Sequence, residues 1–180
     1  MLWRRLLPAE LDFVIQFFGE AQAQWLAQHV RIGVRRIGDT RRALSWNGGW
    51  ISFPRSCFEV TERGFALRVK YPAVAGLFAH ELLHALQRLA GMPVTRQSLW
   101  LQCQSLLGRC DPYAYQPCIS AIHRLRRFWQ AQVEQQAQMW EDAVAAAVLG
   151  KPLAQMQWVM LAVRQGRLQR QKRCSASNNE

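Results

Sequence analysis

The sequence predicts a single α+β domain that is mostly helical, with a small N-terminal β-sheet or hairpin. Three observations favour this fold class. The chain has 180 residues, half of them apolar, which is enough for one hydrophobic core without disulfide bonds. Long segments carry apolar residues at helical spacing, and a shorter region has turn residues between two apolar pieces. We expect residues 1–163 to form the domain and residues 164–180 to be a basic, disordered tail.

The N-terminal part of the chain supplies the predicted sheet. The first thirty residues have apolar side chains at helical spacing and predict an amphipathic helix that covers the core. In the segment ALSWNGGWISFP, Asn47–Gly49 is a turn signal between two short apolar runs, so we expect a β-hairpin there. Residues 58–69 alternate loosely between apolar and polar side chains and predict a further strand.

Helices are expected in the rest of the domain. The segment Ala73–Ala90 contains mostly good helix formers and no proline, and Gly91–Pro93 is a typical helix terminator. The cysteine-rich stretch 94–117 predicts a loop with a short helix. One long helical region is expected over residues 119–149, and a further helix over residues 153–163.

Inside the first of these helices, the segment His80–His84 has the sequence HELLH, an HExxH motif. Residues four apart share one face of an α-helix, so the two imidazoles can both reach one zinc ion. Glu81 projects beside that metal without having to bind it and can accept a proton from a metal-bound water. The motif therefore predicts His80 and His84 as zinc ligands and Glu81 as a catalytic base. The alternative is that both histidines only bond solvent or core carbonyl groups.

A catalytic zinc ion needs a third protein ligand and an open position for water. The candidates are Glu134, Glu141, Asp142 and His123, all in the second helical region. Glu134 is favoured because the segment Glu134–Ala137 resembles the ExxA element that supplies a glutamate ligand in many zinc peptidases. Glu141 or Asp142 could instead orient a zinc-bound histidine through its free ring N–H.

Two tyrosines, Tyr113 and Tyr115, lie in the predicted loop between the two helical regions. A tyrosine hydroxyl can stabilise the negative charge that develops on a carbonyl oxygen during hydrolysis. We assign this catalytic role to Tyr115. The alternative for both residues is a packed or half-exposed loop aromatic.

The HELLH motif, followed about fifty residues later by VEQQAQMWED, resembles the gluzincin-type zinc metallopeptidases. More narrowly, the chain is similar to small bacterial Vgr-related metallopeptidase proteins encoded near type VI secretion and phage-like injection systems. The resemblance rests on SWNGGWISFP, FAHELLHALQ and YAY…VEQQAQMWED. It implies a zincin-like fold, zinc ligands at His80, His84 and Glu134, and Glu81 as the general base.

The same resemblance implies a function and a mode of substrate binding. The expected activity is zinc-dependent hydrolysis of a peptide or protein substrate, by a secretion-system effector or accessory protein. An extended peptide is expected to bind along the edge of a strand, for which Ile51–Phe53 is the local candidate. The alternative is a catalytically silent zinc-binding adaptor, such as a component of a phage-like particle, that docks on an acidic partner or on nucleic acid.

The net charge of +11 implies an anionic partner or serves only solubility. The arginines that could form a basic patch are those of the tail and Arg31, Arg35, Arg36, Arg41 and Arg42. No recognised nucleic-acid-binding module is present, so their simplest interpretation is a solvated face and not a nucleic-acid site. No apolar run approaches the roughly 18 residues of a membrane helix. We therefore expect no membrane span.

The N-terminal sequence and the cysteines indicate in which cellular compartment the protein is expected. Pro8 and Glu10 interrupt the apolar stretch that a cleavable signal peptide would need. The five cysteines are odd in number and form no CxxC pair, which fits a reducing compartment. We expect a cytoplasmic protein, with export without a cleavable signal peptide as the alternative. In an exported protein, a disulfide could form among Cys103, Cys110 and Cys118.

Overall fold

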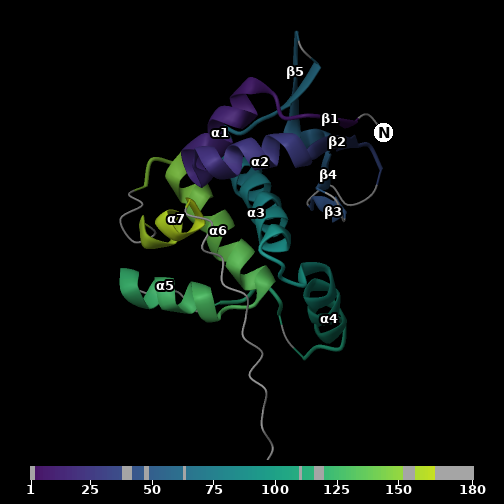
Figure 1. The fold of residues 1–180 in the computed structure, drawn as a ribbon. Coiled ribbons are helices and arrows are strands. Elements are labelled where there is room, and N and C mark those ends of the chain that lie inside the picture. Colours follow the sequence, from purple (N-terminus) through teal and green to yellow (C-terminus); the bar gives the residue numbers. More distant parts are fainter. Residues whose placement is uncertain are drawn as a thin grey trace, which may run out of the picture.

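Two helices, α3 (Pro72–Leu89) and α6 (Val133–Val148), run antiparallel through the centre of the molecule (Figure 1). Their mutual contact is more extensive than that of any other helix pair among the described residues.

The computed structural model describes residues 3–37, 42–46, 49–62, 64–109, 111–115, 120–151 and 157–164. Within these ranges the fold is α+β and mostly helical, with a small mixed sheet, as predicted.

The main sheet has four short strands in the order β1-β2-β4-β3, and their bounds are β1 Trp3–Arg4, β2 Arg31–Arg35, β3 Leu44–Trp46 and β4 Trp50–Pro54. Strands β3 and β4 pair antiparallel, with Trp46 opposite Trp50. This pairing confirms the predicted hairpin, although its turn residues 47–48 lie outside the described ranges. Strand β1 is antiparallel to β2, and β2 is parallel to β4.

The prediction that Ile51–Phe53 forms an edge strand is wrong. This segment belongs to β4, which lies between β2 and β3, and both of its edges are already paired. The pairing with β2 brings together segments about twenty residues apart, as in Ile32 opposite Ile51, and a local sequence pattern cannot show it. The edge next to β4 is instead formed by β3.

The first thirty residues form two helices and not one. Helix α1 (Pro8–Phe18) ends at Gly19, and α2 (Glu20–His29) begins directly after it. Gly19 has a φ of +85°, a left-handed conformation that favours glycine, and the chain changes direction there. Both helices keep the predicted amphipathic character, since α1 buries Phe13, Phe17 and Phe18 in the core.

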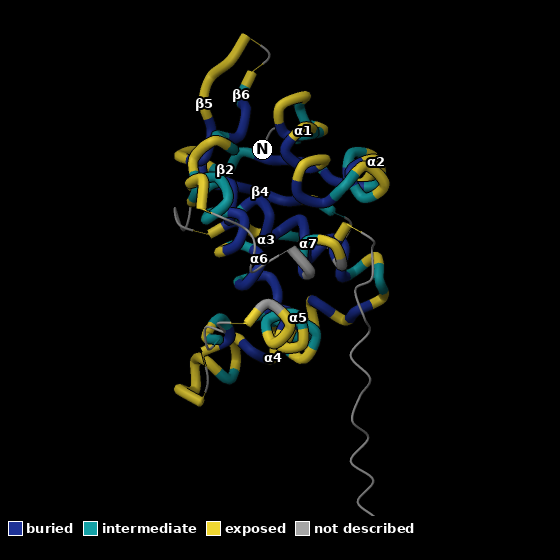
Figure 2. The backbone as a smooth tube through the Cα atoms, turned by 90° about the vertical axis from the view of Figure 1, so that its left-hand side faces the viewer, coloured by how far each residue is buried: buried dark blue, intermediate teal, exposed yellow. Residues whose placement is uncertain are grey.

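The predicted strand at residues 58–69 is a second hairpin. A short 3₁₀ turn, η1 (Arg55–Cys57), leads into β5 (Phe58–Thr61), which pairs antiparallel with β6 (Gly64–Leu67). The tip of this two-stranded sheet extends beyond the rest of the molecule and is exposed (Figure 2).

Helix α3 confirms the predicted helix and ends before Gly91, which has a φ of +75°. The other helices are α4 (Val94–Leu106), α5 (Ala121–Gln130) and α7 (Gln157–Arg164). Helix α4 is longer than the predicted short helix, because no glycine or proline interrupts it before Gly108. The helical region predicted over residues 119–149 contains two helices, because extended backbone at Ala131 and Gln132 separates α5 from α6.

Aromatic side chains join the layers around α3. Phe78 of α3 lies 5.4 Å from Phe13 of α1 and 5.9 Å from Phe53 of β4, measured between ring centroids. Trp140 of α6 lies 5.6 Å from Phe18 in the same way. Helix α3 is consequently buried on nearly all sides, which fixes its position beneath the sheet and beside α6.

Some of the predictions concern residues outside the ranges that the structure describes. Arg164, the first residue of the predicted tail, is the last residue of α7, and the rest of the tail, Cys110 and Cys118 are not described. Cys57 and Cys103 are free cysteines. No helix in the described part of the chain is both long and apolar enough to cross a membrane.

Candidate metal centre

The HExxH histidines face α6 at the middle of the antiparallel helix pair. His80 and His84 lie one turn apart on α3, and Glu134 lies in the first turn of α6. All three side chains are buried. The Nε2 atoms of the two rings are 3.2 Å apart, and Glu134 Oε2 lies 3.6 Å from His80 Nε2 and 3.4 Å from His84 Nε2. The structure thus brings together the three ligands that the sequence favoured, as a buried group that could hold a metal ion.

The spacing of these donor atoms fits a shared cation better than hydrogen bonds. A tetrahedral ion with bonds of about 2.0–2.1 Å keeps its ligand atoms about 3.3 Å apart. All three separations lie close to that value. The two ring-to-carboxylate distances are longer than the roughly 2.7–2.9 Å of a charge-assisted hydrogen bond. The triangle therefore has the dimensions of one face of a tetrahedral metal site.

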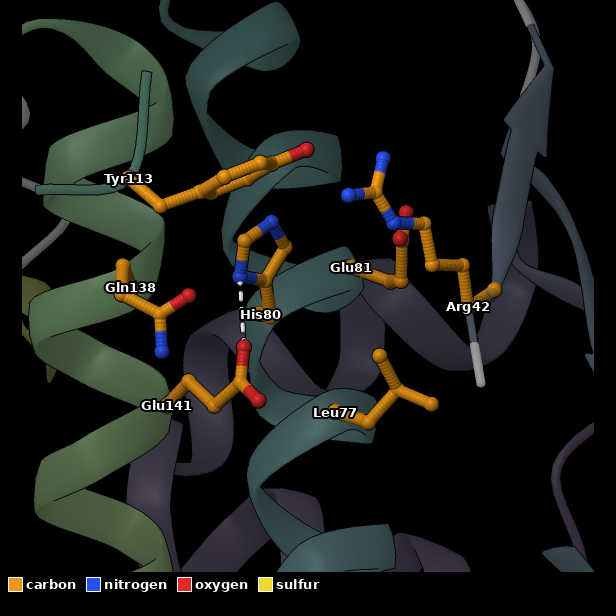
Figure 3. Close-up of a pocket in the computed structure, with 8 residues that line it drawn as sticks. Arg42, Leu77, His80, Glu81, Tyr113, Gln138 and Glu141 are labelled. Carbon is orange, nitrogen blue, oxygen red and sulfur yellow. Dashed lines mark ion pairs between the residues drawn. The ribbon is translucent and has the colours of Figure 1, made fainter. Parts of the chain in front are cut away.

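Each histidine has a different partner on its other ring nitrogen. His80 Nδ1 lies 2.9 Å from Glu141 Oε2, an ion pair drawn as a dashed line in Figure 3. His84 Nδ1 lies 2.7 Å from the amide oxygen of Gln87. An acceptor at Nδ1 holds the ring so that its Nε2 lone pair faces the metal. Glu141 thus takes the orienting position that the sequence offered to either Glu141 or Asp142.

The acceptor for His84 is itself held by a buried chain of amides. Gln87 Nε2 donates to Gln136 Oε1 at 2.8 Å, and Gln136 Nε2 donates to the carbonyl oxygen of Phe128 at 2.9 Å. Both glutamines are essentially inaccessible to solvent. This chain fixes which end of the Gln87 amide faces His84. Neither glutamine was predicted from the sequence to belong to the site, although a glutamine on the buried face of the motif helix was a usable signal.

The local charges match a cation-binding site. Burial lowers the pKa of His80, but the carboxylates of Glu134 and Glu141 outweigh burial and raise it to about 10. Burial raises the pKa of Glu134, but His80 and His84 outweigh it and hold that pKa well below its ordinary value. The group therefore concentrates negative charge around two imidazoles, and a proton on His80 stabilises that charge in the absence of metal.

Glu81 and His80 line one cavity of about 200 Å³. Its other lining residues are Arg42, Ala43, Leu77, Tyr113, Gln138 and Glu141. The Oε2 atom of Glu81 is buried and has no hydrogen-bond partner among the described residues. A carboxylate oxygen in that state can accept a proton from a molecule that enters the cavity.

Tyr113, and not Tyr115, lies at this cavity. The Tyr113 ring is 6.3 Å from the His80 ring between centroids, and the guanidinium of Arg42 lies 5.5 Å from the Tyr113 centroid (Figure 3). Burial raises the pKa of Tyr113, so its hydroxyl keeps its proton and can donate it. The hydroxyl of Tyr115 donates to Asp142 instead. The geometry therefore does not agree with the prediction of Tyr115 as the catalytic tyrosine.

The remaining ligand candidates do not join the cluster. His123 is exposed on α5, and Asp142 is exposed and accepts hydrogen bonds from Tyr115 and Gln138.

Arg88, one turn beyond His84, donates to Ser45 Oγ at 2.9 Å and connects the motif helix to β3. From the sequence, Arg42 was expected only on a solvated basic face, and Arg88 has no predicted role because it lies outside the HExxH motif.

Comparisons of the chain with protein-family models, with curated proteins and with solved structures give no match. Function therefore has to be inferred from the geometry of the site. Three buried donor atoms have the spacing of a metal site, and an unpartnered carboxylate oxygen lies beside them.

Proposed function

We propose that this protein is a zinc-dependent metallopeptidase in which His80, His84 and Glu134 bind zinc and Glu81 is the general base. The triangle of donor atoms beside Glu81 is the observation that carries the proposal. Two imidazoles and one carboxylate at tetrahedral spacing are a donor set that suits zinc. When bound, zinc lowers the pKa of a water molecule towards 7 and polarises a carbonyl group.

The side chains around the cavity have complementary roles in hydrolysis. Glu81 accepts a proton from the attacking water and passes it to the leaving amine, for which its unpartnered Oε2 is available. Tyr113 and Arg42 reach the same cavity with groups that donate hydrogen bonds (Figure 3). Both suit the negative charge that develops on the carbonyl oxygen of the substrate. Tyr113 thus takes the role first assigned to Tyr115.

The edge strand β3 is the proposed docking site for the peptide. Its outer edge is unpaired among the described residues, and Arg42 and Ala43, which line the cavity, come directly before it. The Arg88–Ser45 hydrogen bond holds this strand against the motif helix. A peptide that adds to β3 as a further strand would pass the cavity in an extended conformation.

The alternative of a silent structural zinc site needs a fourth protein ligand. The described residues offer three donor atoms, and Glu141 lies against Nδ1 of His80, which leaves it out of the Nε2 cluster. This arrangement favours a site with one position left for water.

The test is metal analysis together with peptide hydrolysis. Purified wild type should hold one zinc per chain and cleave members of a mixed-sequence peptide library, as detected by mass spectrometry. Glu81→Gln should keep the zinc and lose at least about 100-fold in rate, since a general base contributes on the order of 10²–10⁴. His80→Ala should lose the zinc.

Glu59→Gln, a change of the same kind at an exposed position of β5, is the matched control and should behave as wild type. Wild-type turnover in Glu81→Gln would remove Glu81 from its role. Absence of zinc from the wild type after exposure to the metal would refute the site itself.

A further inference from the structure

Helix α4 has an apolar stripe that faces solvent. Leu99, Trp100 and Leu106 expose 63%, 64% and 87% of their surface, and Leu107, just beyond the helix, exposes 67%. Leu99 and Leu106, and likewise Trp100 and Leu107, are seven residues or two turns apart, so the two adjacent pairs lie on one side of the helix. The buried residues of α4 are Val94 and Leu101, which lie on the opposite side. A surface helix ordinarily turns its apolar face to the core, so this outward stripe indicates a further binding partner.

The two helices at this end of the molecule are rich in arginine. The described residues 94–109 and 120–131 contain five arginines and no Asp or Glu: Arg96, Arg109, Arg124, Arg126 and Arg127. Both α4 and α5 lie at the same end of the molecule, opposite the β5–β6 hairpin, in two perpendicular views (Figures 1 and 2). The segment between these helices contains one exposed acid, Asp111, so this end of the molecule combines exposed leucine and tryptophan with an excess of positive charge.

We propose that the α4–α5 end of the molecule binds the surface of an anionic lipid bilayer. Leu99, Trp100 and Leu106 would enter the boundary between headgroups and acyl chains, while the arginines contact lipid phosphates. Exposed Trp and Leu on a helix, together with an excess of Arg over acidic residues, is the composition of interfacial helices. The binding is peripheral, and it is independent of the proposed peptidase activity.

Two other occupants fit this surface less well. A second copy of the chain, paired through the same face about a two-fold axis, would place arginines against arginines. Nucleic acid would be bound by charge and by aromatic stacking, and neither uses exposed leucines. An anionic bilayer accommodates both the charge and the aliphatic side chains.

The test is co-sedimentation of the full-length, zinc-loaded protein with vesicles. We expect binding to vesicles of phosphatidylcholine with about one third phosphatidylglycerol and much weaker binding to phosphatidylcholine alone. Added salt should weaken the binding, because it screens the attraction between arginines and phosphates. No binding to the anionic vesicles at low salt, or equal binding to both compositions, would overturn the proposal.

Substitutions locate the surface. The double variant Trp100→Ser/Leu106→Ser should lower the partition coefficient at least roughly tenfold, because it removes two large apolar side chains from the contact with the bilayer. Trp100→Phe should retain binding. The control is Val60→Ser on β5, which removes an equally exposed apolar side chain at the other end of the molecule and should have no effect.

The charge is tested separately with Arg126→Gln/Arg127→Gln. This variant should lose roughly fivefold in binding for each arginine removed. Arg5→Gln/Arg36→Gln, which changes the net charge equally at exposed positions elsewhere, should lose much less. Equal losses in the two charge variants would overturn the proposal, as would binding of an oligonucleotide or an acidic protein without binding of vesicles.

Discussion

The two candidate zinc histidines differ in what orients them. A carboxylate, Glu141, lies behind His80, whereas a neutral amide, Gln87, lies behind His84. The carboxylate favours a proton on His80 in the metal-free protein, and the amide oxygen accepts a hydrogen bond from Nδ1 of His84. Removal of Glu141 should therefore affect metal binding through the protonation of His80, and removal of Gln87 should affect it through the orientation of the His84 ring.

Gln87→Leu tests the neutral acceptor. The substitution leaves His84 Nδ1 and Gln136 Oε1 without their buried partners, so the ring loses its fixed orientation. We expect the affinity for zinc to fall by about 10–100-fold, measured by competition with a chromophoric chelator. Gln24→Leu, at an exposed position of α2, is the control. Unchanged affinity in Gln87→Leu would show that the amide chain only serves packing.

The pKa shifts predict how the stability of the metal-free protein depends on pH. The folded-state pKa of His80 is raised from 6.5 to about 10, so its contribution is complete below pH 6.5 and is lost as the pH rises through 10. The pKa of Glu134 is lowered from 4.5, so its contribution is present above pH 4.5 and is lost on acidification. Stability should therefore be greatest between about pH 5 and 6.5.

Urea unfolding in the presence of a chelator measures this dependence. The free energy of unfolding should fall steadily from pH 6.5 to pH 10, and the fall should be smaller in Glu141→Gln, which removes one of the charges that raise the pKa of His80. A free energy that rises over this range would contradict the assignment of a protonated His80 to the metal-free state.

At the scale of elements, the site depends on how closely α3 and α6 approach. A Cβ atom at Gly76 would lie 3.0 Å from both the backbone oxygen and the Cγ of Glu141. Gly76 stands one turn before His80, so this contact controls the distance between His80 and its carboxylate partner. The glycine therefore permits the helix approach that the site requires.

Gly76→Ala should move Glu141 away from α3 by a few tenths of an ångström and weaken zinc binding by about tenfold. Alanine favours a helix over glycine by about 1 kcal/mol, so propensity alone would stabilise the protein. Chelator competition and urea unfolding distinguish the two effects. A more stable variant with unchanged zinc affinity would show that the contact relaxes without cost to the site.

A buried carboxylate in α1 joins three elements. Glu10 accepts two hydrogen bonds from Arg4 of β1, at 2.6 and 2.7 Å, and one each from the backbone N–H groups of Leu7 and Leu67, both at 2.9 Å. Glu10→Gln leaves the largely buried Arg4 without its counter-charge and should cost about 3 kcal/mol of unfolding free energy. Asp12→Asn, exposed on the same helix, is the control in urea unfolding. A loss below 1 kcal/mol would contradict the structural role of the pair.

For the whole molecule, local patterns in the sequence predict the parts of the fold that depend on local forces. The helix-forming residues before the Gly91 terminator predict α3, and they place His80, Glu81 and His84 on that helix. The turn signal Asn47–Gly49 gives the β3–β4 hairpin. The resemblance of Glu134–Ala137 to an ExxA element favours Glu134, which the structure brings to the histidines.

The remaining features depend on contacts between distant segments. The central place of β4 comes from its parallel pairing with β2, and the choice of Tyr113 over Tyr115 comes from how one loop lies against α6. Gln87 and Arg42 belong to no motif, and only the folded chain shows what they contact. The break between α5 and α6 contains neither glycine nor proline and could not be predicted from helix propensity.

X-ray absorption at the zinc edge of the zinc-loaded protein tests the central claim most directly. We predict two imidazole nitrogens and two oxygens, one from Glu134 and one from water, at about 2.0–2.1 Å, and loss of a protein oxygen ligand together with weaker zinc binding in Glu134→Ala. Sulfur scattering at about 2.3 Å, or a single imidazole, would contradict a centre built from His80, His84 and Glu134.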